Sequence, residues 1–141
     1  MSVIKENYGQ ICAKHNNVYY AHHRYKYGTK VEEYELNLIR SSVIPDAKIF
    51  NPSTDLDVDG RSEESIMKDC IEEVKKSDIV VFSSMDGVIG IGVYTEIMEA
   101  STNYIPVYYI YQNSLRSDWS VRVIDDGSRN DKLYAYVNVQ G

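Results

Sequence analysis

One stretch, from Asp78 to Ala100, limits what this chain can fold into, because its hydrophobic pattern changes within a few residues. It begins with a short apolar run, Ile79 to Phe82, which is rich in β-branched residues and typical of a buried strand in a parallel sheet. A loop containing glycine follows, and from Gly90 or Gly92 onward the apolar residues recur at helical spacing. A strand, a glycine-bearing loop and a helix in this order predict an open α/β sheet, which binds ligands at the carboxyl ends of its strands.

The loop and the helix start of this stretch contain residues suited to binding a ligand. Backbone N–H groups at a helix start attract anions, and glycines allow a ligand to approach the backbone closely. We expect Glu96, one turn into the helix, to lie beside the ligand; the alternative is a solvated glutamate on a helix that only packs on the sheet. Asp78 either shapes the pocket or fixes the turn into the strand. The other predicted ligand-binding residues of this stretch are Ser84, Asp86, Gly87, Gly90 and Gly92.

The pattern of the whole chain alternates strands with helices. At 141 residues the chain is expected to form a single domain, with a core of about residues 18–111. We predict a Rossmann-like (flavodoxin-like) three-layer α/β domain with a mostly parallel central sheet and right-handed crossovers. The predicted elements are strands at 18–21, 47–50, 79–82 and 105–111, and helices at about 30–40, at about 63–76 and from 90 or 92 onward.

The first predicted helix has a defined start and a defined buried face. Thr29 and Glu32 have the spacing of a capping box, in which Thr29 caps the helix and Glu32 reaches back. The residues predicted to face the sheet are Val31, Tyr34, Leu38 and Ile39.

The C-terminal part of the chain changes character. Residues 121–124 and 132–137 both have the pattern of short strands, and a turn-rich segment that opens with Asp125-Asp126-Gly127 separates them. We expect a C-terminal β-hairpin over about residues 120–138, adding antiparallel strands at one edge of the sheet.

The charge and the cysteine content limit the partners of the chain. Its net charge of -6 argues against general binding to nucleic acid polymers but still permits local binding of small phosphates. The only cysteines are Cys12 and Cys70, as expected for a reduced, cytoplasmic protein. We find no signal peptide and no apolar run long enough to cross a bilayer, so we expect no membrane partner.

The segment after the first strand is dense in hydrogen-bond donors. It contains His22, His23, Arg24 and Lys26, and this basic character favours phosphate recognition; the alternative is an ordinary loop. Metal binding is less favoured, because adjacent histidines rarely chelate one ion and the sequence places no third ligand. The chain has no Walker A sequence and no complete dinucleotide fingerprint. We therefore expect neither a metal ion nor an organic cofactor.

Three short elements of the chain follow one another in a recognisable order. Val18 to Ala21 has the form of an N-terminal strand with a tyrosine at its second position, and Ser77 to Phe82 has the form of a strand entered by an aspartate. Gly92 to Ala100 carries its glutamate at the spacing of a G-T-x-x-E-hydrophobic-G-x-A element. Together, over residues 18 to 111, they resemble the nucleoside 2'-deoxyribosyltransferases and the related 2'-deoxynucleoside 5'-phosphate N-hydrolases.

This resemblance implies chemistry at an N-glycosidic bond. In that family the glutamate at the Glu96 position attacks the anomeric carbon of the deoxyribose and expels the base, and water or a second base resolves the glycosyl-enzyme. Tyr19 corresponds to a strand tyrosine that orients the glutamate. The loop from His22 to Arg24 corresponds to one that helps to hold the 5'-phosphate of a nucleotide. Such relatives are commonly dimers or larger, with a neighbouring subunit completing the site, so a homo-oligomer is expected.

The chain departs from the family pattern at three positions. Val93 stands where the family has threonine, and Met98 stands where it has glycine. The family's helical aspartate falls on Cys70, and Asp69, our candidate for its substrate-binding role, is one residue away, which turns a side chain by about 100° on a helix. Two main functions remain open: cleavage or transfer at the N-glycosidic bond of a (deoxy)nucleoside or nucleoside 5'-monophosphate, and a non-catalytic nucleotide-binding or sequestering module of the same fold. A third is an assembly protein with a tyrosine-rich interface.

Overall fold

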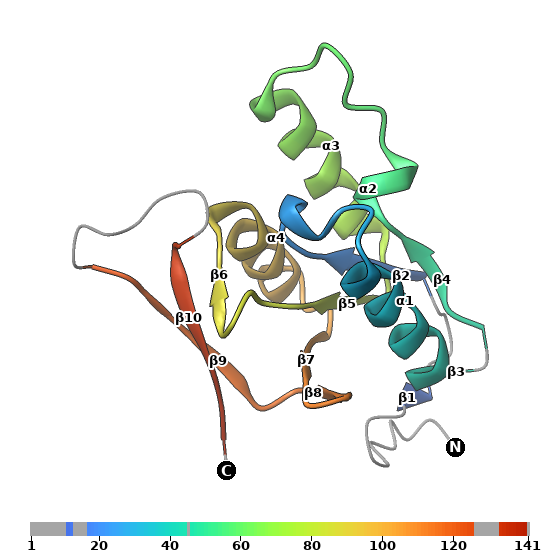
Figure 1. The fold of residues 1–141 in the computed structure, drawn as a ribbon, viewed down its shortest axis with the longest axis vertical. Coiled ribbons are helices and arrows are strands. Elements are labelled where there is room, and N and C mark those ends of the chain that lie inside the picture. The colour runs from blue at the N-terminus through green and yellow to red at the C-terminus, as the bar shows by residue number, and fades with distance from the viewer. Residues whose placement is uncertain (1–10, 13–16, 45, 126–132, 141) are drawn as a thin grey trace.

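The computed structural model describes residues 11–12, 17–44, 46–125 and 133–140 (Figure 1). The helices are α1 (Lys30–Ser42), α2 (Pro52–Asp55), α3 (Glu63–Lys76) and α4 (Ile91–Thr102), with a short 3-10 helix η1 (Arg24–Lys26). The strands are β1 (Ile11–Cys12), β2 (Asn17–Ala21), β3 (Val43–Ile44), β4 (Lys48–Phe50), β5 (Ile79–Phe82), β6 (Val88–Ile89), β7 (Val107–Tyr111), β8 (Ser114–Arg116), β9 (Trp119–Val123) and β10 (Ala135–Val139). The four predicted core strands and the three predicted helices are each found within about two residues of their predicted bounds.

The central sheet has five strands in the order β4-β2-β5-β7-β8. The first four run parallel, and the edge strand β8 runs antiparallel to β7. The chain leaves β2 toward β4 on one side and leaves β5 toward β7 on the other, so the carboxyl ends of β2 and β5 meet where the connections diverge. Open α/β sheets form a ligand crevice at such a position. The prediction of a mostly parallel sheet with flanking helices is confirmed.

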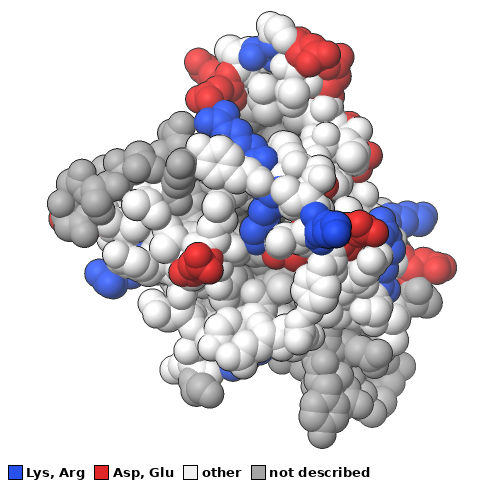
Figure 2. Space-filling model, in the orientation of Figure 1, with Lys and Arg blue, Asp and Glu red and all other residues white. Residues whose placement is uncertain are grey.

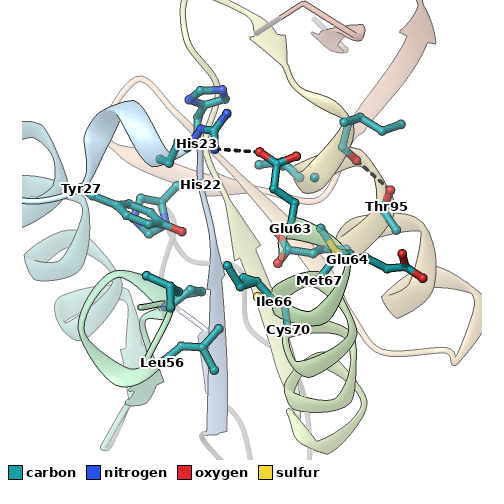
Figure 3. Close-up of a pocket in the computed structure, with 17 residues that line it drawn as sticks. His22, His23, Tyr27, Leu56, Glu63, Glu64, Ile66, Met67, Cys70 and Thr95 are labelled. Carbon is teal, nitrogen blue, oxygen red and sulfur yellow. Dashed lines mark hydrogen bonds and ion pairs between the residues drawn. The ribbon is translucent and has the colours of Figure 1, made fainter. Parts of the chain in front are cut away.

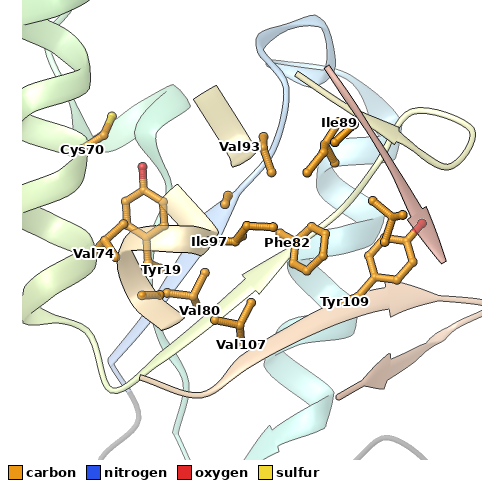
Figure 4. Close-up of a cluster of buried hydrophobic side chains, with 14 residues drawn as sticks. Tyr19, Cys70, Val74, Val80, Phe82, Ile89, Val93, Ile97, Val107 and Tyr109 are labelled. Carbon is orange, nitrogen blue, oxygen red and sulfur yellow. The ribbon is translucent and has the colours of Figure 1, made fainter. Parts of the chain in front are cut away.

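Helices cover both faces of the central sheet, because successive side chains of a strand point to opposite faces. Tyr19 of β2 belongs to a buried cluster with Val74 of α3 and Ile97 of α4 (Figure 4). Its neighbour Tyr20 belongs to the cluster on the other face, with Ile39 of α1. Burying each large apolar side chain contributes about 1.5–3 kcal/mol, so these two clusters hold the three layers together.

Helix α1 buries a different face from the one that its apolar residues predict. Val31 and Tyr34 are 50% and 49% exposed, so the prediction that they face the sheet is wrong. Glu32 and Glu35 are buried in their place, and Ile39 is buried as predicted. The reason is that hydrogen-bond donors near the ends of β2 and β5 satisfy the two carboxylates, which makes their burial tolerable.

The C-terminal hairpin forms, but it does not extend the central sheet. Strands β9 and β10 pair antiparallel, with Tyr136 opposite Arg122, which confirms the predicted hairpin. They join β6 in a separate three-stranded sheet, so the predicted attachment to the edge of the main sheet is wrong. Strand β8 occupies that edge instead, after a tight turn in which Gln112 and Asn113 have positive φ angles. The predicted turn residues Asp126 and Gly127 and the strand start at Lys132 lie outside the described residues.

The visible surface mixes both signs of charge. Figure 2 shows lysine and arginine side chains interspersed with aspartate and glutamate on the face seen in that view. Within the described ranges, each helix is too short or too polar to cross a bilayer.

Candidate functional site

A cavity of about 540 Å³ opens beside the carboxyl end of β2, on the α3 and α4 side of the sheet (Figure 3). Its volume is within the range of small-molecule sites, and its position agrees with the crevice implied by the strand order. Four segments distant in sequence form the walls: the connection after β2, α2 with the loop that follows it, the first two turns of α3, and the start of α4. The apolar lining residues are Pro52, Leu56, Val58, Ile66, Met67, Ile91 and Val93.

Glu96 is the buried acid of this cavity. It projects from the second turn of α4 and is 6% exposed, whereas Glu63 and Glu64, which also line the cavity, are exposed. The Tyr19 hydroxyl donates a hydrogen bond to Glu96 Oε2. Tyr19 is fully buried and its ring stacks on that of Phe50 with centroids 5.7 Å apart, so its hydroxyl is held in place. The structure brings together the two residues that the family resemblance pairs.

The pKa of the Glu96 carboxyl is raised to near neutral pH. Burial raises the pKa of Glu96 to about 7, because a carboxylate is costly to hold away from water, and hydrogen bonds from Tyr19 and Cys70 oppose this rise. Burial, and then the Glu96 charge, raise the pKa of Tyr19, so the phenol remains a donor. A carboxyl with such a pKa on the wall of a cavity is suited to act as a nucleophile, a general base or a general acid.

Cys70, and not Asp69, faces the cavity from α3. Cys70 is 5% exposed, and burial raises the pKa of its thiol to about 11, so the thiol is uncharged at neutral pH. Asp69 lies outside the cavity lining, and Arg61 Nη2 donates to its Oδ2 at 2.6 Å. The same arginine donates to the Asp57 carbonyl at 3.0 Å, so Asp69 anchors the loop between α2 and α3. The one-residue step between Asp69 and Cys70 explains why only one of them reaches the site.

His22 forms a fixed part of the cavity wall. Its Nε2 lies 2.7 Å from Glu32 Oε2 and its Nδ1 lies 3.2 Å from the Tyr20 carbonyl oxygen, so both ring nitrogens have partners. Burial lowers the pKa of His22, and the hydrogen bond to Glu32 opposes that change. Glu32 also accepts a hydrogen bond from the Gly28 N–H at 3.1 Å, which ties the loop to the start of α1.

His23 and Arg24 lie at the mouth of the cavity. His23 caps η1, with its Nδ1 accepting from the Tyr25 N–H at 3.1 Å. Arg24 Nη1 donates to Glu63 Oε1 at 3.1 Å, and both of these side chains are largely exposed (Figure 3). This exposed ion pair joins the loop after β2 to the first residue of α3, at the entrance to the cavity. The three predicted residues from His22 to Arg24 therefore all line it.

Most of the loop after β5 has a local structural role. Asp86 and Gly87 have φ angles of 53° and 81°, and Met85 and Val88 exchange two backbone hydrogen bonds of 2.8 and 3.1 Å around them, as in a two-residue hairpin turn. The turn therefore accounts for the glycine. Ser84 Oγ accepts a hydrogen bond from the Gly87 N–H at 3.1 Å. Ser84, Asp86 and Gly87 all lie outside the cavity lining.

The remaining predicted residues divide between the two ends of the sheet. Gly90 is the N-cap of α4 and lies outside the lining, whereas Gly92 lines the cavity. Asp78 lies at the amino end of β5, away from the cavity, where its Oδ2 accepts from the Asn17 N–H at 3.0 Å. This contact is the structural alternative that the sequence leaves open, because it fixes the entry into the strand.

Tyr27 is a site residue that the sequence pattern does not single out. It lines the cavity, and its ring is tilted against His22 with centroids 4.9 Å apart (Figure 3). Burial, and then the Glu96 charge, raise the pKa of Tyr27, and both residues line the same cavity. The available signal is its place in the donor-rich loop, just before Gly28, whose φ angle is 74°. The apolar wall residues carry no such signal, because helix-core residues have the same pattern.

Comparisons of the chain with protein-family models, with curated proteins and with solved structures found no match. In the described part of the chain, no group of three or more His, Cys, Asp or Glu side chains is arranged to hold a metal ion. The cavity itself is therefore what bears on function: it has a buried carboxyl of near-neutral pKa, a tyrosine hydrogen-bonded to that carboxyl, apolar walls and a mouth with Arg24 and His23.

Proposed function

We propose that this protein cleaves, or transfers at, the N-glycosidic bond of a (deoxy)nucleoside or nucleoside 5'-monophosphate, with Glu96 as the nucleophile. One observation carries the proposal: a buried carboxyl, hydrogen-bonded to Tyr19, lines a small-molecule cavity beside the carboxyl end of a parallel strand. The order of the sequence motifs supports the same assignment. We place the chain, on these motifs and on the strand order β4-β2-β5-β7, with the flavodoxin-like deoxyribosyltransferase family, and we expect a homo-oligomer.

The proposed reaction has two steps. A Glu96 carboxylate oxygen bonds to the anomeric carbon while the bond from that carbon to the base nitrogen breaks, and the base leaves with the electron pair and takes up a proton. Water or a second base then attacks the same carbon, releases Glu96 and restores the carboxylate. A carboxylate close to the ring stabilises the oxocarbenium-like transition state of both steps. The Tyr19 hydroxyl donates to Oε2 of Glu96 and so helps to hold the carboxylate in one orientation.

The walls and the mouth of the cavity suit the other parts of such a substrate. Leu56, Ile66 and Met67 provide apolar surface for a flat base, and the Tyr27 ring lies across from α3. Arg24 and His23 at the mouth provide hydrogen-bond donors for a 5'-phosphate, which Arg can bind through two N–H groups. The proposed substrate thus has its sugar at the buried carboxyl and its charged end near solvent.

A second function is favoured by one specific observation. Cys70 stands at the cavity where the family has an aspartate, so the site holds a single buried carboxyl among its described residues. A module that binds a nucleotide without turning it over requires the cavity but not the second carboxylate. This candidate and the enzyme both predict that a ligand raises the melting temperature, and only the enzyme predicts base release.

The deciding experiment is chromatographic detection of free base after incubating the protein with a panel of deoxy- and ribonucleosides and their 5'-monophosphates. We expect release from at least one member, and loss of that release in Glu96→Gln. Glu99→Gln is the matched control, because Glu99 is on the same helix but lies outside the cavity, where its Oε2 accepts from Asn103 Nδ2 at 2.8 Å.

Two outcomes would count against the enzyme. If folded wild-type protein releases no base, with or without an added acceptor base, the binding module is the better description for that panel. If Glu96→Gln releases base at the wild-type rate, Glu96 is not the nucleophile. Release that depends on the acceptor base would identify a transferase rather than a hydrolase.

A further inference from the structure

Three polar groups from three different elements meet at the buried end of the cavity. They are the Tyr19 hydroxyl from β2, the Cys70 thiol from α3 and the Glu96 carboxyl from α4. All three residues are at most 6% exposed. Figure 4 shows the hydroxyl end of Tyr19 directed toward the side on which α3 carries Cys70. Helices α3 and α4 pack against each other, and Cys70 of α3 and Glu96 of α4 both line the cavity.

Among the residues that the structure describes, Glu96 has no cation beside it, so its carboxylate depends on hydrogen-bond donors such as Tyr19 and Cys70. In the described part of the chain, Glu96 forms no ion pair with a lysine or an arginine. A buried carboxylate without a cation depends on hydrogen bonds to be held in one orientation. Three titratable groups affect Glu96 or are affected by it: Tyr19 from β2, Cys70 from α3 and Tyr27 from the loop before α1. The other charged or titratable residues of the cavity lining are His22, His23, Arg24, Glu63 and Glu64.

We propose that Cys70 is a positioning residue, whose thiol acts with the Tyr19 hydroxyl to hold the Glu96 carboxylate in the orientation that presents it to the cavity. This inference rests on the proposed function for its catalytic meaning, but the contact itself is a property of the folded protein. In this proposed arrangement the thiol donates to Glu96, which opposes the rise in the pKa of that carboxyl that burial causes. Since the thiol stays protonated, it adds a donor without adding a second negative charge.

The choice of a thiol has a physical consequence. A carboxylate at position 70 would stand against Glu96, and two like charges in a buried site make ionisation of both unfavourable. A thiol avoids that repulsion but is a weaker donor than a hydroxyl. The ionised fraction of Glu96, and with it the pH range in which it can act as a nucleophile, should therefore depend on which donor stands at position 70.

The test compares Cys70→Ala, which removes the donor, with Cys70→Ser, which replaces it by a hydroxyl. The first readout is the titration of the Glu96 side-chain carboxyl by carbon-13 NMR, assigned by the loss of its signal in Glu96→Gln. We expect the titration midpoint to move upward by about one pH unit in Cys70→Ala, and to stay at or below the wild-type value in Cys70→Ser. This readout requires no turnover.

The control for loss of packing is Val74→Ala. Val74 lies one turn further along α3, is fully buried and lies outside the cavity lining, and its truncation removes more volume than Cys70→Ala does. We expect Val74→Ala to lower the melting temperature but to leave the Glu96 titration at its wild-type midpoint. A common midpoint in Cys70→Ala, Val74→Ala and the wild type would overturn the positioning role, and so would equal shifts in the two alanine variants.

The second readout, the pH profile of base release, separates this inference from the proposed function. A profile that moves upward in Cys70→Ala and returns in Cys70→Ser supports both. Base release with an unmoved profile in both variants overturns the inference and leaves the function standing. A titration that moves in protein that releases no base supports the contact between Cys70 and Glu96 and overturns the proposed function.

Discussion

Two buried tyrosine–glutamate pairs lie on opposite faces of strand β2, and their surroundings differ. Tyr19 donates to Glu96 on the side of α4, and its neighbour Tyr20 donates to Glu35 on the side of α1. Both glutamates are 6% exposed. Glu35 has a cation beside it, with Lys26 Nζ donating to its Oε2 at 2.9 Å, whereas Glu96 borders a cavity and has no such partner among the described residues.

Lys26 gives the Tyr20–Glu35 pair a role that the Tyr19–Glu96 pair does not have. Glu35 also accepts from Ser83 Oγ at 2.7 Å, and Lys26 donates to the Ser84 carbonyl at 2.7 Å, so this network ties η1 and α1 to the end of β5. A compensated buried carboxylate of this kind holds elements together. An uncompensated one is costly to the fold, and its persistence at a cavity is the pattern of a functional site. The comparison thus indicates a structural role for the Tyr20 face, whereas the Tyr19 face is the one that the proposed function uses.

The largest effect is expected from removing the cation of the structural pair. Lys26→Met leaves Glu35 buried without a counter-charge, and we expect the free energy of unfolding to fall by about 3–5 kcal/mol in chemical denaturation. The double variant Lys26→Met/Glu35→Gln should recover much of this loss, because neutral side chains replace both partners. A loss of less than about 1 kcal/mol in the single variant would mean that Lys26 does not compensate Glu35.

The opposite result is expected at Glu96, where removing the charge should stabilise the protein. The pKa of Glu96 is about 7 in the folded protein and 4.5 as its ordinary value, so the folded state binds more protons than the unfolded state between these two pH values. The contribution of the protonated Glu96 to the free energy of unfolding is therefore complete below about pH 4.5. It is lost as the pH rises to about 7, and the total loss is about 3 kcal/mol.

In the Glu96→Gln variant the side chain at position 96 cannot ionise, so the free energy of unfolding should not fall in this way as the pH rises. We expect it to exceed the wild type by up to about 3 kcal/mol at pH 8.5 and to match it at pH 4, measured by urea denaturation at both pH values. Glu99→Gln should follow the wild type at both. A Glu96→Gln variant that is less stable than the wild type at pH 8.5 would show that hydrogen bonds outweigh the cost of burying the charge.

The two tyrosines provide the next comparison, because each substitution to phenylalanine removes one hydroxyl. Tyr19→Phe takes a donor from Glu96, so base release at pH 6 should fall by about tenfold or more, with a smaller loss at pH 9 where Glu96 is ionised in any case. Tyr20→Phe should lower the free energy of unfolding by about 1–3 kcal/mol, while base release per folded molecule is unchanged. Equal kinetic losses in the two variants would contradict the division between the two faces.

The sequence predicts those parts of the fold that local patterns determine. The apolar runs locate β2, β5 and β7, the helical spacing locates α3 and α4, and the order of elements implies the parallel sheet. The pairing of Tyr19 with Glu96 is implied by the family resemblance and not by the hydrophobic pattern, and the structure shows it as a hydrogen bond. Strand β8 is missed because its turn uses Gln112 and Asn113 rather than a glycine.

The site is predicted less well, because it depends on contacts between distant segments. The loop glycine Gly87 is a turn residue, and only the hydrogen bonds around it reveal this. The choice between Asp69 and Cys70 depends on a helix rotation that spacing from a neighbouring strand does not fix. The buried face of α1 is misassigned for a related reason: a rule that searches for apolar faces cannot foresee that Lys26, His22 and other donors make Glu32 and Glu35 the buried pair.

The smallest effect is expected at the face of α1 that the apolar pattern wrongly assigns to the core. Val31→Ala and Tyr34→Ala should each change the free energy of unfolding by no more than about 0.5 kcal/mol, because both side chains are half exposed and alanine favours the helix. Ile39→Ala on the same helix is the buried control and should cost about 2–5 kcal/mol. If Val31→Ala costs as much as Ile39→Ala in urea denaturation, the apolar face is the buried one. Glu35 would then be solvated, and its likeness to Glu96 would no longer hold.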